Sequence, residues 1–126
     1  MPQTRIQNWV ELLEMHAQTR PDALSFAYLQ DGLAVSSERN FGQLYLRAKA
    51  IAAELQARNL AGERALLLFP NDLNYIEAFL GCLLAGVVAV PVYPPQMSRQ
   101  VGRMMSILQD SGARVMLASR MVLSMI

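Results

Sequence analysis

Short apolar runs alternate with helical apolar periodicity in the second half of the chain. Residues 65–69 form an uninterrupted apolar run, residues 73–85 carry an apolar helical pattern, and residues 87–92 form a Val-rich run around Pro91. A strand, a helix and a strand in this order make the βαβ unit, and strands without polar alternation are typical of a parallel sheet covered on both faces. The pattern therefore predicts a buried parallel sheet.

The same alternation continues toward the end of the chain. A further helix is predicted over residues 98–110, a third parallel strand over residues 114–118, and Ser119 is a candidate N-cap of a last helix. The fold class is therefore α/β. We expect β-α-β-α-β over residues 62–126, the doubly wound parallel sheet with right-handed crossovers.

The first half of the chain, residues 1–61, predicts a helix, a hairpin and a second helix. Apolar residues at three- and four-residue steps favour a helix over residues 6–19, with a buried stripe made of Ile6, Trp9, Val10, Leu13 and Ala17. Strand-like runs at residues 24–29 and 34–39 flank the turn dipeptide Asp31-Gly32, so we expect a β-hairpin.

Two sequence features predict which face of the hairpin is buried and where the second helix begins. Phe26 and Tyr28 alternate with smaller residues, so one face of the hairpin is expected to be buried. Asn40, with Gln43 three residues later, is an Asn-led capping box that predicts a helix running to about Arg58.

Composition limits the size of the protein and its partners. A chain of 126 residues is long enough for one ordinary domain, and we expect residues 1–126 to form a single partial domain. Hydrophobic residues make up 53% of it and charged residues 17%, an apolar excess that suggests a surface covered by a partner or by more of the same polypeptide. The net charge of +1, without a basic block, gives no indication of nucleic-acid binding.

The single cysteine and the membrane test both favour a cytoplasmic protein. Cys82 stands alone in an apolar run, which excludes a disulfide framework and indicates core packing in a reducing compartment. No secretory signal is seen. The uncharged stretch between Glu77 and Arg99 is long enough to span a membrane, but glycines and prolines interrupt it, so a helix followed by a buried strand explains it better.

The turn after the first parallel strand decides against a dinucleotide site. It reads Pro70-Asn71-Asp72-Leu73 and contains none of the glycines that let a backbone approach a pyrophosphate. Asp72 lies where a functional acid would stand in a doubly wound sheet, yet capping of the following helix by Asn71 or Asp72 is the stronger interpretation. Neither Glu63 nor Glu77 is expected to pair with it as a metal site.

His16, Lys49 and the methionines do not by themselves indicate a functional site. His16 has no clustered ligands, and Lys49, the one lysine of the chain, falls outside the apolar stripe of its helix. Eight Met residues, five of them from Met104 onward, are compatible with core filling, with an adaptable binding surface, or with a surface covered by a further part of a longer chain.

Several motifs resemble one known family. GERALLLF, followed by NYIEAFLGCLLAGVVAVPVYPP, is similar to the N-terminal part of fatty acyl-AMP ligases, which belong to the superfamily of acyl-CoA synthetases and AMP-forming adenylation domains. Gly81-Cys82-Leu83 and the Tyr-Pro-Pro sequence resemble the ligase branch in particular. The resemblance implies an incomplete N-terminal subdomain of the adenylate-forming fold. Gly81 and Gly86 would then serve close packing between helix and sheet, and prolines 91, 94 and 95 would end a strand and redirect the chain.

The resemblance implies a chemistry whose machinery this chain lacks. Such ligases use ATP and Mg²⁺ to convert a fatty acid into an acyl-adenylate, and pass the acyl group to an acyl carrier protein or to CoA. They do so with a Thr/Ser/Gly-rich phosphate loop followed by lysine and with a second lysine further on. No such loop is present and Lys49 matches neither lysine, so no catalytic, cofactor-binding or metal residue is assigned.

Three functional hypotheses follow. The leading one is a part of a fatty acyl-AMP ligase that is inactive alone, packs against the remainder of the adenylation domain and self-associates when isolated. The alternative is a stand-alone α/β binding or interaction module without catalysis, which binds a carrier protein or an acyl chain. A nucleotide-binding regulatory domain is disfavoured because the glycine loop and an acid cluster are missing.

Overall fold

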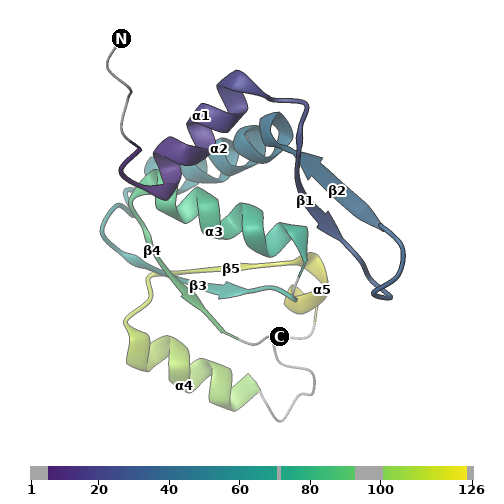
Figure 1. Ribbon diagram of the computed structural model, residues 1–126. Helices are drawn as coiled ribbons and strands as arrows, with labels where there is room; N and C mark the ends of the chain where they lie inside the picture. The colour runs from purple at the N-terminus through teal and green to yellow at the C-terminus, as the bar shows by residue number, and fades with distance from the viewer. Residues whose placement is uncertain (1–5, 71, 93–100, 125–126) are drawn as a thin grey trace.

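A computed structural model describes residues 6–70, 72–92 and 101–124, and of Met121 the backbone alone. Figure 1 shows a parallel sheet between two layers of helices, with a hairpin at one side. The elements in chain order are α1 (Trp9–Thr19), β1 (Leu24–Tyr28), β2 (Ser37–Asn40), α2 (Phe41–Ala57), β3 (Arg64–Leu68), α3 (Leu73–Ala85), β4 (Val88–Pro91), α4 (Val101–Ser111), β5 (Val115–Ala118) and α5 (Arg120–Leu123). None of the helices in these ranges is long and apolar enough to cross a bilayer.

The parallel sheet has the order β4-β3-β5, so β3 lies in the middle. Its neighbours pair in parallel register, with Leu66 opposite Val90 on one side and Met116 on the other. Helix α3 connects β3 to β4 on one face, and α4 lies on the opposite face (Figure 1). The predicted doubly wound arrangement is confirmed.

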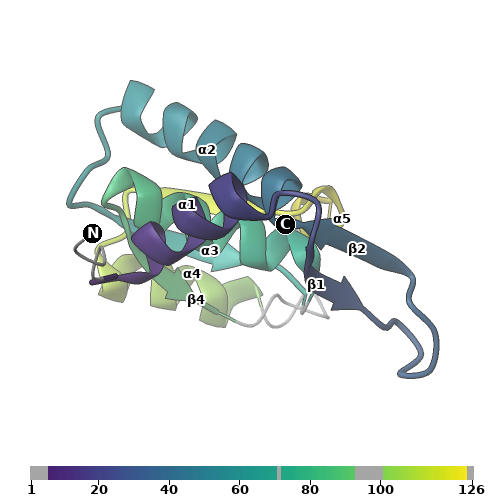
Figure 2. The same cartoon turned by 45° about the horizontal axis from the view of Figure 1, so that its top comes forward.

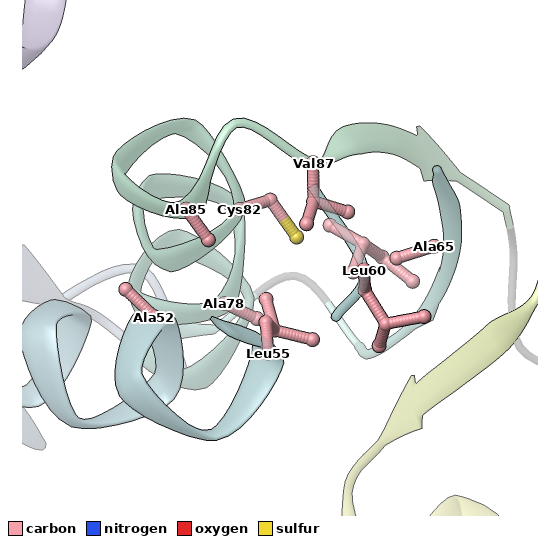
Figure 3. Packing of buried hydrophobic residues seen from close by; sticks show 9 residues of the cluster. Ala52, Leu55, Leu60, Ala65, Ala78, Cys82, Ala85 and Val87 are labelled. Carbon is pink, nitrogen blue, oxygen red and sulfur yellow. The ribbon is translucent and has the colours of Figure 1, made fainter. Parts of the chain in front are cut away.

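The core is divided by β3, whose residues 65–68 are fully buried and alternate between the two faces. Ala65 and Leu67 face α2 and α3, where Figure 3 shows Cys82 pointing toward Val87. Leu66 and Leu68 pack on the α4 side with Met104 and Val122. A strand buried on both faces needs apolar residues at every position, which explains the absence of alternation in its sequence.

Helix α2 begins at the predicted capping box. Asn40 Oδ1 accepts a 2.7 Å hydrogen bond from the Gln43 backbone N–H, and Gln43 Oε1 accepts one of 3.0 Å from the Asn40 N–H. Helix α1 starts three residues later than predicted, because Asn8 caps it by accepting a hydrogen bond from Glu11 N–H. Trp9, expected in the buried stripe of this helix, is 71% exposed.

The hairpin differs from prediction in length and in burial. Strand β2 starts at Ser37 rather than at residue 34, because Asp31 Oδ1 accepts hydrogen bonds from the backbone N–H groups of Leu33 and Ala34 and holds them in a wide turn. These bonds also lower the pKa of the Asp31 carboxyl. Phe26, predicted to be core, is 41% exposed, because it lines an open hollow beside α1, α2 and α3. The turn of the hairpin projects beyond the helices (Figure 2).

Gly81 within α3 and Gly86 directly after it have roles other than helix–sheet packing. A Cβ at Gly81 would lie 2.6 Å from Ile51 Cγ2 and 3.2 Å from the Ala48 carbonyl oxygen, so Gly81 lets α3 approach α2 rather than the sheet. Gly86 ends α3 in the left-handed conformation, with φ +72°, and nothing lies within 4 Å of a Cβ built there. Pro91 ends β4 as predicted, whereas prolines 94 and 95 lie outside the described residues.

Candidate functional site

The candidate site is a crevice at the carboxyl ends of β3 and β5. These strands are neighbours whose following segments lead to α3 and α5, and crevices of this kind are where doubly wound sheets bind ligands. The crevice has a volume of about 520 Å³. Its lining residues are Ile51, Phe69, Pro70, Asp72, Asn74, Glu77, Ala78, Ala118, Ser119 and Arg120.

Asp72 acts as a helix cap in this crevice. Its Oδ1 accepts a 3.1 Å hydrogen bond from the Tyr75 backbone N–H, and its backbone is extended, as an N-cap requires. The capping interpretation is therefore confirmed for Asp72, while Asn71 lies outside the described residues. A carboxylate occupied in this way holds one oxygen toward its own helix.

Glu77 is the buried charge at the site, with a side chain only 5% exposed. Its Oε1 accepts a 2.8 Å hydrogen bond from Arg39 Nε of β2, and Arg47 Nε of α2 lies 3.7 Å away. Burial of a carboxylate is tolerable when a cation pairs with it, so this cluster ties the hairpin and α2 to α3.

Sequence reasoning missed the Glu77 cluster. From the sequence, Glu77 is a possible metal-site partner of Asp72 and nothing more specific. One signal was available: Glu77 falls one position before the buried Ala78 in an apolar helix, without Lys or Arg three or four residues away to pair with it. An acid on a buried helix face without a local partner predicts a distant cation, but the sequence does not identify Arg39.

The far wall of the crevice comes from the segment after β5. Ser119 Oγ accepts a 3.3 Å hydrogen bond from Val122 N–H and caps the short helix α5, as predicted. Arg120 is exposed beside it. Among the residues that the structure describes, the crevice thus combines apolar side chains with the exposed cation of Arg120, and no nucleophile lies next to a base.

Cys82 is not a candidate nucleophile either. It is fully buried between α3 and the sheet, and burial raises the pKa of its thiol from 9.0 to about 11. A thiol with this pKa stays protonated at neutral pH, where the thiolate would be the reactive form. Its predicted role in core packing is confirmed.

ATP with Mg²⁺ does not fit the residues that the structure describes. The segment joining β3 to α3 has no glycine to admit a phosphate. Among the described residues, no group of three His, Cys, Asp or Glu side chains is close enough to hold a metal ion. The two carboxylates of the crevice are engaged by a helix N-terminus and by arginine.

His16 and Lys49 lie away from the crevice and contact aromatic rings. The His16 ring is 4.7 Å from that of Phe41, and its Nδ1 accepts a 3.1 Å hydrogen bond from Arg20 Nε. Lys49 Nζ lies 5.2 Å from the centre of the Tyr45 ring. Of the methionines, Met104 is buried in the core and Met105 is 41% exposed, so no single explanation covers them.

Comparison with known proteins gives one consistent family. The family model for AMP-binding enzymes matches residues 13–124. The chain is 36% identical over 120 residues to the medium-chain-fatty-acid–[acyl-carrier-protein] ligase JamA of Moorena producens, covering 93% of this chain and 20% of the ligase. It is 38% identical over 103 residues to a long-chain-fatty-acid–AMP ligase of Mycobacterium tuberculosis, covering 79% of this chain and 18% of that ligase.

Solved structures agree with these relatives. The fatty acyl-adenylate ligase from L. pneumophila, in complex with acyl adenylate and pyrophosphate, superimposes with a TM-score of 0.84 at 35% identity, covering 91% of this chain and 20% of that one. The fold predicted from the sequence, that of the N-terminal region of adenylate-forming enzymes, is confirmed. The chain spans about one-fifth of the length of the relatives it matches.

Proposed function

The chain belongs to the family of AMP-binding enzymes, and we propose that it forms the amino-terminal part of an enzyme that activates a fatty acid with ATP. The carboxylate would attack the α-phosphorus, displace pyrophosphate and form an acyl-adenylate. A thiol would then attack the acyl carbon and release AMP, giving a thioester. The observation that carries the proposal is the match across residues 13–124 together with fatty acid ligases as relatives.

The role of this chain in that enzyme is a scaffold in a single partial domain. Its parallel sheet and packed helices would support the rest of the adenylation domain, while ATP, Mg²⁺ and the catalytic side chains are held elsewhere in the enzyme. The acyl acceptor would be an acyl carrier protein, as the name of the Moorena producens relative suggests, with CoA as the other acceptor. A cytoplasmic location and self-association of the isolated chain belong to the same proposal.

Complementation in trans tests the proposal. A related fatty acid–[acyl-carrier-protein] ligase is expressed without the part equivalent to residues 1–126, and exchange of labelled pyrophosphate into ATP is measured with medium- and long-chain fatty acids. Neither piece should be active alone, and adding this chain should restore exchange. Exchange by this chain alone would contradict its inactivity, and a mixture that binds without regaining exchange would contradict the proposed scaffold role.

An acyl-binding module without catalysis is the second candidate, and one hollow favours it. The hollow of about 280 Å³ lies among α1, α2, α3 and β1 and is lined largely by apolar side chains, including those of Trp9, Phe26 and Leu80. Trp9 provides a fluorescence probe. Saturable quenching by a fatty acid with a brominated chain, together with a failure to complement, would favour this module over the ligase part.

A further inference from the structure

The hollow among α1, α2, α3 and β1 has mostly apolar walls, and all four elements that form it lie between residues 9 and 85. Its volume of about 280 Å³ lies just below the range of about 300–1,000 Å³ typical of ligand pockets, which suits one slender chain. Leu13 and Leu44 line it and are 6% and 2% exposed. Trp9 and Phe26 also line it but are 71% and 41% exposed, so they lie where the hollow opens to solvent.

Polar side chains are few in this wall. Ser25 lines the hollow, but its Oγ donates a 2.8 Å hydrogen bond to the backbone carbonyl oxygen of Arg39 and is engaged within the hairpin. Among the described residues that line the hollow, His16 is the one ionisable side chain. Its Nδ1 accepts a 3.1 Å hydrogen bond from Arg20 Nε, so a cation stands at the end of the hollow where His16 lies.

Arg20 is suited to bind an anionic head group at this end. Its guanidinium lies 5.1 Å from the centre of the Phe41 ring, which also lines the hollow. In the part of the chain that the structure describes, no carboxylate lies within 4.0 Å of this guanidinium. A guanidinium has five N–H donors in a planar fork, and at most two of those of Arg20 face His16. The remaining donors match the geometry of a carboxylate.

We propose that the hollow binds a medium-chain fatty acid as its carboxylate, with the alkyl chain between α1 and β1 and the head group paired with Arg20. Burial of the chain supplies most of the affinity, because an ion pair that is open to solvent contributes little. The charge supplies selectivity, since an alcohol or a thioester of the same chain length offers Arg20 no negative charge. The proposal rests on the acyl-binding candidate above and specifies the head group that this module recognises.

A titration followed by the fluorescence of Trp9, the one tryptophan of the chain, tests the proposal with octanoate and 1-octanol, whose chains are equal in length. Octanoate should bind saturably and at least about threefold more tightly than 1-octanol. Arg20→Gln should remove this preference by weakening the binding of octanoate alone, and Arg20→Lys should retain part of it. Arg103→Gln is the matched control, because it removes the same exposed charge from α4, on the opposite face of the sheet (Figure 1).

Circular dichroism verifies that each variant is folded. The proposal is supported by a preference for octanoate that Arg20→Gln removes and that the control variant keeps. Saturable binding of octanoate that Arg20→Gln leaves unchanged overturns the assignment of the head group, while the acyl-binding candidate stands. Absence of saturable octanoate binding overturns both. The pyrophosphate exchange assay in trans is independent of these results, so the ligase proposal is tested separately.

Discussion

Arg39 donates a 2.8 Å hydrogen bond from Nε to Glu77 Oε1, across 38 positions of sequence. The bond joins the last strand of the hairpin to the buried face of α3. The Arg39 side chain is 22% exposed and that of Glu77 is 5% exposed, so loss of either partner leaves a largely buried charge without its counterpart.

Glu77→Ala is therefore expected to lower the free energy of unfolding by about 2–4 kcal/mol. Arg47→Ala is the matched control, because Arg47 approaches the same carboxylate at 3.7 Å but is 57% exposed. Its loss should cost about 0–1 kcal/mol. Urea unfolding followed by circular dichroism measures both values, and equal losses would contradict the expectation that the buried carboxylate contributes more than the exposed Arg47.

Gly81→Ala should destabilise the protein by about 1–3 kcal/mol, because the new methyl group would overlap Ile51. Gly102→Ala is the control, since a Cβ at this helical position meets nothing within 4 Å. That change should be stabilising by about 0.5–1 kcal/mol. Adding Ile51→Ala to Gly81→Ala should recover part of the loss, and strict additivity of the two changes would contradict the contact.

Asp72 allows a test that separates its charge from its capping role. Asp72→Asn keeps an oxygen that can accept the hydrogen bond from Tyr75 N–H, whereas Asp72→Ala removes it. We expect the Ala variant to lose about 0.5–2 kcal/mol of stability and the Asn variant to lose less than about 0.5 kcal/mol. The prediction fails if thermal unfolding shows both variants equally destabilised.

The thiol of Cys82 should be protected at neutral pH and should make folding sensitive to high pH. Because its pKa rises from 9.0 to about 11 on burial, the folded state holds the proton more tightly than the unfolded state. Its contribution to stability is thus complete below pH 9 and is lost as the pH rises toward 11. Unfolding midpoints measured across this range, with Cys82→Ala as the reference, isolate the effect of this thiol.

Local signals in the sequence predicted the elements that local interactions determine. The pair Asn40 and Gln43 fixed the start of α2, because both capping bonds lie within one turn. The apolar run of β3 predicted a strand covered on both faces, and two helical layers do cover it. These features can be predicted without knowing which residues distant in the sequence lie beside them.

Features set by distant neighbours were missed. Phe26 alternates like a core residue, but its burial depends on how closely the helices approach the hairpin, and the hollow between them leaves it 41% exposed. Gly81 was expected to face the sheet, and only the placement of α2 shows that Ile51 is its neighbour. The sequence likewise does not identify Arg39 as the partner of Glu77, because several other arginines could form the same ion pair.

The central position of β3 has a consequence for how the protein is made. Its first neighbour, β4, is synthesised soon afterwards, but its second neighbour, β5, comes only at residues 115–118. A nascent chain therefore carries the strand that is most deeply buried in the folded protein with one side unpaired until β5 has left the ribosome. During that interval, the segment around residues 65–68 is the one that a chaperone would have to shield.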